Sequence, residues 1–163
     1  MENYLMLNGK RIDLTEEQIR TLGLETKEDY FSRYGEYYYI GNTGCIFKDF
    51  EDKSANCKVS EGRYNVANYC KNEEFIKQRA LHETLDRLLW RFSMQNDGDK
   101  IDWNDEDSYK FYIYHDYRKY IFYIDANRWC RHNKIYFLTR EIAQRALDEI
   151  VFPFMKKHPE FVW

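Results

Sequence analysis

The chain has 163 residues, of which 18% are aromatic, and its 25 Lys and Arg against 28 Asp and Glu give a net charge of −3. This length is typical of one domain with a core that needs no disulfide bonds, so we expect residues 1–163 to form a single domain. The aromatic content excludes intrinsic disorder, and the charge excludes a strongly basic nucleic-acid binder that relies on phosphate contacts over its whole surface.

The first predicted element is a small hairpin. Residues 4–7 and 10–13 favour strands, and an Asn-Gly pair between them is a strong two-residue turn signal. Thr15 followed by Gln18 is a capping-box pattern, which predicts a short helix directly after the hairpin. We expect residues 1–24 to add this hairpin and helix at one edge of the main body.

The remainder of the chain reads as two copies of one strand–strand–strand–helix unit, over residues 36–94 and 108–163. In the first copy the predicted strands are 36–40, 45–47 and 63–69, and the helix is 72–92. In the second copy they are 109–114, 120–124 and 134–137, and the helix begins near Thr139. Pro153 lacks an N–H group, so we expect that helix to kink or stop near Phe152.

Matching letters support the repeat. Residues 78–81 recur as residues 144–147, both Gln-Arg-Ala-Leu, and the helix patterns around them are alike. The alternative is a coincidence between two amphipathic helices. We favour the repeat and predict an α+β fold, in which antiparallel sheet packs on helices. The apolar helix stripes predict nearly inaccessible side chains at Leu85, Leu88, Phe92, Ile142, Ala146 and Ile150.

The second predicted hairpin carries aromatic or apolar residues on both faces. Antiparallel sheets usually have one apolar and one polar face, so one face here must be covered by another layer or used for binding. We expect partner-binding side chains at Tyr112, Tyr114 and Tyr123, together with Trp90, which lies outside the apolar stripe of its helix. Such a face could also meet a second copy of the chain across a two-fold axis, giving a homodimer.

An acidic stretch connects the two units. Residues 97–107 hold six acidic side chains against one Lys, but their spacing does not fit the calcium-binding loop template. The ordinary interpretation is a solvated connector. The alternative is a mimic of nucleic-acid phosphates that competes for a basic groove. Its candidate partner-binding residues are Asp102, Asp105, Glu106 and Asp107.

The sequence predicts no catalytic, cofactor or metal site. The histidines are scattered, there is no Cys-x-x-Cys pair, and Cys130 lies too close to His132 for the usual structural zinc pairings. A Gly-x-Ser-x-Gly motif and a Gly-rich phosphate loop are also absent from the sequence. We therefore expect a protein that is not an enzyme.

The cysteines and the N-terminal residues bear on the compartment. The N-terminus lacks the pattern of a signal peptide, and no stretch approaches the ~18 apolar residues of a membrane helix. We expect a cytoplasmic protein with no membrane partner, in which Cys45, Cys57, Cys70 and Cys130 are reduced.

Several stretches of the chain together resemble a known group of proteins. They are residues 7–18, 37–40, 67–70, 89–92, 102–103, 153–155 and 158–163. Over nearly its whole length the chain is similar to small accessory proteins encoded by phages and prophages of Gram-positive gut bacteria. The motifs of this group are structural, so the resemblance assigns no catalytic or ligand residue. It implies an accessory phage protein, and such proteins often inhibit host defence, anti-CRISPR proteins among them.

Two classes of function therefore stay open. The first is a non-enzymatic inhibitor that binds a host defence protein, for instance a CRISPR effector nuclease, and Tyr and Trp are common at the hot spots of such interfaces. The alternative is a nucleotide or nucleic-acid binder, either a signalling-nucleotide sponge or a single-strand binder, because tyrosines beside Lys and Arg are typical of a stacking platform. An enzyme of unknown type comes third.

Overall fold

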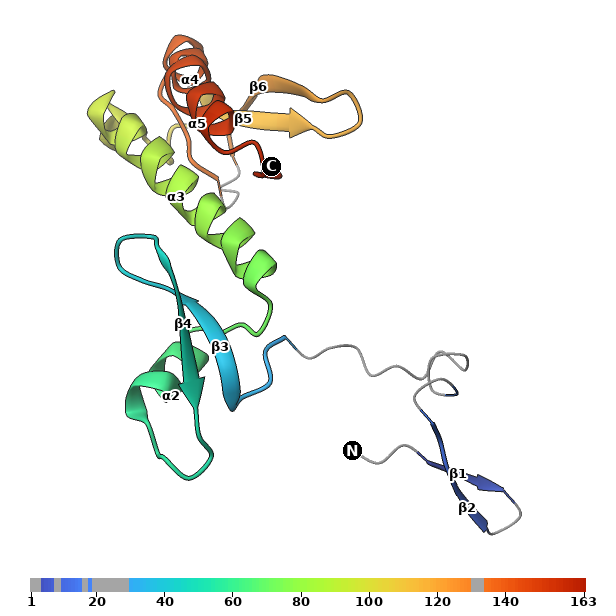
Figure 1. Cartoon of the computed structure of the whole chain (residues 1–163). Coiled ribbons are helices and arrows are strands. Elements are labelled where there is room, and N and C mark those ends of the chain that lie inside the picture. Colours follow the sequence, from blue (N-terminus) through green and yellow to red (C-terminus); the bar gives the residue numbers. More distant parts are fainter. Residues whose placement is uncertain (1–3, 8–9, 16–17, 19–29, 130–133) are drawn as a thin grey trace.

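The computed structural model describes residues 4–7, 10–15, 18, 30–129 and 134–163. These residues form an α+β fold, as predicted, with three two-stranded antiparallel sheets (Figure 1). The strands are β1 (Tyr4–Leu7), β2 (Lys10–Asp13), β3 (Gly35–Ile40), β4 (Ile46–Glu51), β5 (Lys110–Asp116) and β6 (Ile121–Asn127). The helices are α2 (Lys58–Asn65), α3 (Glu73–Gln95), α4 (Arg140–Ala146) and α5 (Phe152–Lys157).

The N-terminal prediction is confirmed where the structure describes it. β1 pairs with β2 in an antiparallel hairpin. Thr15 and Gln18 form the reciprocal bonds of a capping box: the Thr15 N–H donates to Gln18 Oε1 at 2.9 Å, and the Gln18 N–H donates to Thr15 Oγ1 at 3.3 Å. The Asn-Gly turn at residues 8–9 and the rest of the predicted first helix lie outside the described residues.

The repeat is visible as two hairpins that are each joined to the start of a helix by an isolated antiparallel bridge. Tyr38 of β3 pairs with Cys70, and Phe111 of β5 pairs with Phe137. Two residues after each bridge stands the N-cap of a helix, Asn72 for α3 and Thr139 for α4, and each cap side chain accepts a backbone N–H of the first turn. The same order of hairpin, bridge, cap and helix therefore occurs twice.

The third strand predicted for each unit is wrong. Only a single bridge residue pairs at each place, and most of the predicted strand 63–69 is instead helix α2 and the turn that ends it. The Asn68 N–H donates to the Arg63 carbonyl at 2.8 Å, and Ala67 adopts a positive φ of 55°. These local bonds turn the chain away from the sheet, so the strand-like alternation around Val66 faces solvent.

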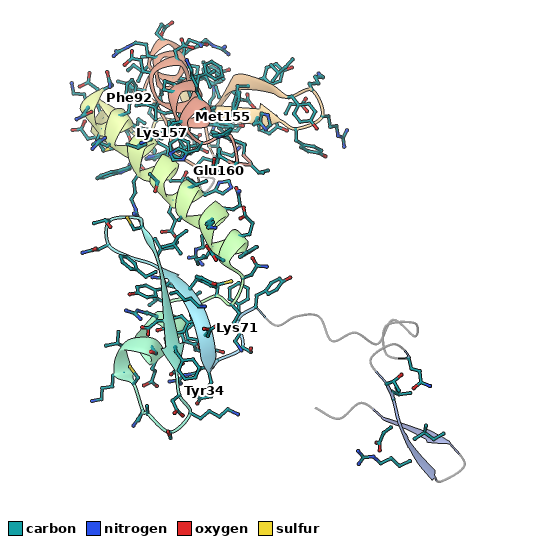
Figure 2. All side chains as sticks on the ribbon, viewed as in Figure 1. Tyr34, Lys71, Phe92, Met155, Lys157 and Glu160 are labelled. Carbon is teal, nitrogen blue, oxygen red and sulfur yellow. The ribbon has the colours of Figure 1, made fainter. Side chains whose placement is uncertain are left out.

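Helix α3 is shared by two hydrophobic cores (Figure 1). Its first turns place Ile76 and Ala80 against Ile40 and Cys70, beneath the β3–β4 hairpin. Its later turns join a larger core with β5, α4 and α5. Figure 2 labels Phe92 in this later part of α3 and Lys71 in the segment just before the helix begins.

The predicted core is only partly confirmed. Leu85, Phe92 and Ala146 are buried, with 3%, 7% and 0% of their surface exposed. Leu88, Ile142 and Ile150 were expected to be nearly inaccessible, but they are half-buried at the rim of the larger core. A helix turns only a narrow stripe fully inward, and these three positions stand at the edge of their stripes.

Pro153 does not stop the C-terminal helix, so of the two predicted outcomes near Phe152, a kink or a stop, the stop is excluded. The chain continues from α4 through a π-helical turn, Leu147–Val151, directly into α5, which holds Pro153 in its first turn. The wider turn accommodates a residue that cannot donate a backbone hydrogen bond. Val151 and Phe154 on either side of Pro153 stay buried in the larger core.

Candidate interaction surface

The β5–β6 hairpin has one face in the larger core and one face away from it. The two strands pair without a bulge from Lys110 opposite Asn127 to Asp116 opposite Ile121. Because side chains alternate along a strand, Phe111 and Ile113 point into the core. The other face carries Tyr112 and Tyr114, which the sequence analysis selected as partner-binding residues.

Tyr112 does not belong to an exposed surface, contrary to the prediction. Only 8% of it is exposed, because its ring packs edge-on against Tyr136 at 5.5 Å between centroids. Its hydroxyl donates to Asp125 Oδ2 at 2.8 Å. Burial, reinforced by the Asp125 carboxylate, raises the pKa of Tyr112 to about 12. Tyr112 is therefore a structural residue.

Tyr114 and Tyr123 are exposed, in agreement with the expectation. They stand directly opposite each other on β5 and β6 and are 43% and 40% exposed. The Lys134 Nζ lies 5.4 Å from the centroid of the Tyr114 ring, and the Lys119 Nζ lies 6.0 Å from that of Tyr123. The two rings thus form an aromatic pair with cations beside it.

The turn between the strands extends this aromatic surface. Asp116 stabilises the turn, since its Oδ1 accepts the Arg118 N–H at 2.9 Å and the Lys119 N–H at 3.3 Å. Tyr117 and Tyr120 are 65% and 82% exposed. Tyr120 adopts a positive φ of 54°, a conformation that glycine and asparagine tolerate far better than a tyrosine does.

We call these exposed side chains the hairpin surface. It consists of Tyr114, Tyr117, Tyr120, Ile121 and Tyr123, with Arg118, Lys119 and Lys134 among them. Figure 1 shows the β5–β6 turn projecting away from the helices. Sequence reasoning missed Tyr117, Tyr120 and Ile121, although a tyrosine in place of the usual turn residues was a usable signal.

Trp90 and the acidic residues belong to other elements than the hairpin surface. Trp90 is 56% exposed on α3, and no ring contact joins it to the hairpin among the described residues. Asp102, Asp105, Glu106 and Asp107 are all exposed in the connector before β5. The structure therefore does not bring the predicted site residues together into one site.

A buried lysine holds the acidic connector against the start of β5. Lys110 is 1% exposed, and its ammonium donates to the carbonyl oxygens of Asp105, Ser108 and Arg128. Trp103 of the same connector packs edge-on against Tyr136, at 4.9 Å between centroids. The Asp107 N–H lowers the pKa of the Asp105 carboxyl by donating a hydrogen bond to it. The connector is anchored at the base of the hairpin, opposite its turn.

A pocket of about 290 Å³ opens between β5, α3 and the last residues of the chain. It is lined by Asp86, Leu89, Ile113, Tyr114, His115, Lys134, Ile135, Phe137 and Trp163. The Gln78 side chain fixes the chain end that forms one wall: its Nε2 donates to the Glu160 carbonyl at 2.7 Å, and its Oε1 accepts the Val162 N–H at 3.1 Å. The lining of the pocket combines apolar side chains with the polar groups of Asp86, His115 and Lys134.

Metal, thiol and membrane features add little to this picture. Within the described part of the chain, no group of three or more His, Cys, Asp or Glu side chains could hold a metal ion. Cys45, Cys57 and Cys70 are free thiols, and Cys130 is outside the described residues. None of the described helices is both long and apolar enough to cross a membrane.

Comparisons with known proteins identify no relative. No protein-family model, no curated protein and no solved structure matches the chain.

Proposed function

We propose that this protein acts by binding another protein through the hairpin surface. The observation that carries the proposal is Tyr120, an 82% exposed aromatic side chain on a residue with φ of 54°. A left-handed conformation costs an ordinary residue roughly 1–2 kcal/mol. A glycine would remove this cost, so a tyrosine at this position is explained by what its side chain contacts outside the fold.

The composition of the hairpin surface supports a protein partner over a nucleic acid. Tyrosine and arginine dominate the hot spots of protein interfaces, and Ile121 adds an aliphatic side chain that cannot stack on a base. A single-strand binder needs a basic groove that follows the phosphate backbone. Here Asp116 and Asp125 lie on the same hairpin as Arg118 and Lys119, and the chain as a whole has a charge of −3.

The partner that we propose is a bacterial defence protein, which this protein inhibits by occupying part of its surface. Support for this partner comes from the resemblance to phage-encoded accessory proteins alone. The hairpin surface supports the mode of action, which is binding without catalysis.

The test compares two double-aspartate variants of this protein, each used as a bait alongside wild type. Tyr114→Asp with Tyr123→Asp places charges on the hairpin surface, whereas Phe50→Asp with Phe47→Asp changes two exposed aromatic residues on β4. Purified wild type and both variants are exposed to host lysate, and captured proteins are identified by mass spectrometry. We expect a protein that wild type and the β4 variant retain and the hairpin variant loses.

Other results would contradict the proposal. If both variants retain every captured protein while circular dichroism shows an intact fold, the hairpin surface is not the binding surface. Nucleotide that co-purifies with wild type, seen as excess absorbance at the nucleotide band, would favour the alternative class. If light scattering shows a dimer that only the hairpin variant loses, the partner is a second copy of the chain.

A further inference from the structure

The first unit shows how the free edge of a hairpin is closed in this fold. Tyr38 exchanges both backbone hydrogen bonds with Cys70, at 2.7 Å and 3.0 Å. Two residues further along β3, the Asn68 side chain takes the place of a strand: the Ile40 N–H donates to Asn68 Oδ1 at 2.7 Å, and Asn68 Nδ2 donates to the Ile40 carbonyl at 2.8 Å. The amide thus satisfies both backbone groups at this edge.

The second unit has the same bridge but lacks the amide. Phe111 exchanges both backbone hydrogen bonds with Phe137, at 3.0 Å and 2.7 Å. In antiparallel register, Ile113 corresponds to Ile40 and Ile135 to Asn68. The side chain of Ile135 has no hydrogen-bonding group, so it cannot close the edge as Asn68 does.

The backbone of Ile113 is consequently open on the side away from β6. Because Phe111 bonds away from β6, the alternation of an antiparallel pair directs the N–H and C=O of Ile113 to that side too. Among the described residues, no backbone or side-chain group there bonds to them. A donor and an acceptor are thus presented side by side on a strand edge.

The pocket of about 290 Å³ lies at this same edge, since Ile113 and Ile135 both line it. Leu89, Phe137 and Trp163 contribute apolar lining to it. The volume is at the lower end of the range of roughly 300–1,000 Å³ for small-molecule sites, and it suits one large apolar side chain better than a cofactor.

We propose that the open edge of β5 at Ile113 binds an extended peptide segment of a partner protein. The main chain of the peptide exchanges two hydrogen bonds with Ile113, in the way that the Asn68 amide bonds to Ile40, and a neighbouring large apolar side chain enters the pocket. This is strand addition, in which backbone bonds provide affinity and the pocket provides selectivity. The proposal deepens the protein-binding function and rests on it.

An extended peptide is the occupant because it matches both features at once. Its backbone carries a donor and an acceptor at the spacing of the β5 edge, and its side chains alternate to the two sides of that edge. A purely apolar ligand would fill the pocket but leave the Ile113 groups without partners, which costs free energy when they are buried. Ile113 is 8% exposed, and an apolar ligand in the pocket would remove the access that solvent still has to these groups.

The test uses the first unit as a template. At Ile40 the edge is closed by the side-chain amide of Asn68. Ile135→Asn places the same amide at the corresponding position of the second unit. It should therefore bond to the Ile113 backbone and compete with a bound peptide. A displayed library of short random peptides is selected against wild type, and the affinities of enriched peptides are measured for wild type, Ile135→Asn and a control, Phe50→Ser on β4, an exposed position outside the proposed binding surfaces. We expect enriched peptides to share a large apolar residue and to bind Ile135→Asn about tenfold or more weakly, with Phe50→Ser unchanged.

A second measurement separates strand addition from simple pocket filling. N-methylation of the peptide at the residue that pairs with Ile113 removes its backbone donor and keeps every side chain, and we expect a similar loss of affinity. Hydrogen exchange of the Ile113 amide should slow in Ile135→Asn and in wild type with bound peptide. Equal peptide affinity for wild type and Ile135→Asn, with that amide protected in the variant, overturns the proposal, and so does a selection that enriches no peptide.

These outcomes are distinct from those for the hairpin surface. A captured protein that is lost with the Tyr114→Asp and Tyr123→Asp variant but kept with Ile135→Asn supports protein binding and rejects strand addition. If both variants still retain the captured protein, both proposals are rejected.

Discussion

Tyr120 is the residue whose local conformation and side chain conflict most. Its φ of 54° favours asparagine or glycine, so we expect Tyr120→Asn to stabilise the fold by about 1 kcal/mol. The same change should weaken partner capture, because it removes the most exposed tyrosine of the hairpin surface. Urea unfolding measures the first effect and lysate capture the second.

Tyr117→Asn is the matched control for this prediction. Tyr117 lies in the same turn and is 65% exposed, but it has no positive φ. It should therefore give no gain in stability. A Tyr120→Asn variant that is no more stable than wild type would show that the turn carries no relievable strain.

Two buried tyrosines predict how stability changes at alkaline pH. Burial raises the pKa of Tyr69 and of Tyr112 to about 12, from an ordinary value of about 10. The folded state holds these protons more tightly than the unfolded state, so their stabilising effect is complete below pH of about 10 and is lost as pH rises through about 12. We expect the free energy of unfolding to fall over this window.

Chemical unfolding at a series of pH values measures this effect. Tyr69→Phe and Tyr112→Phe should each make the fall shallower, because phenylalanine has no proton to lose. Tyr117→Phe is the control at an exposed position and should leave the slope unchanged. A slope that is identical in all three variants would contradict the assignment to the buried phenols.

At the scale of elements, α3 shows how a helix stripe divides into core and rim. Leu85 is 3% exposed within the larger core, whereas Leu88 lies at its rim. We expect Leu85→Ala to cost about 2–5 kcal/mol through lost burial and the cavity that remains. Leu88→Ala should cost clearly less, because solvent already reaches that side chain. Thermal or urea unfolding of both variants tests the difference, and equal costs would contradict it.

The hairpins show which features of a strand or helix are determined by residues close in sequence. The starts of strands β3 to β6 were predicted within one residue, because alternation and turn residues act within a few positions, whereas β4 and β6 continue beyond their predicted ends at residues 47 and 124. The strand expected at residues 63–69 failed because Ala67 and Asn68 close the end of α2, so the local bonds of a helix end replaced those of a sheet. Whether a third strand forms therefore depends on whether helix-end or sheet hydrogen bonds are more favourable there, which the alternation of residues alone does not reveal.

At the scale of the whole molecule, the two cores on α3 differ in size. Among the residues that the structure describes, four buried apolar ones form the cluster beneath β3–β4, whereas eleven form the cluster beneath β5–β6 and the C-terminal helices. Less apolar burial gives a lower free energy of local opening. We therefore expect backbone amides of β3 to exchange with solvent faster than those of β5.

Native-state hydrogen exchange on the full chain measures this difference. Ile76→Ala, in the smaller core, should speed exchange in β3 and leave β5 unchanged, whereas Leu89→Ala should affect β5. Exchange that changes uniformly in both variants would show that the molecule opens as one cooperative unit.

The sequence by itself determined the features that depend on neighbouring residues. The capping box at Thr15 and Gln18, the helix start after Asn72 and the paired strands all follow from bonds within a few positions of the chain. The α+β class and the two similar units followed from the same local patterns.

Only the tertiary structure decided which side chains are available to a partner. Tyr112 and Tyr114 share one face of β5 and are equivalent in the alternation, yet Tyr136 and Asp125 enclose the first and leave the second exposed. Likewise, the difference between Asn68 and Ile135 has a meaning only once the bridges place both beside a strand edge. Burial depends on segments that are distant in sequence, and a local pattern does not contain their positions.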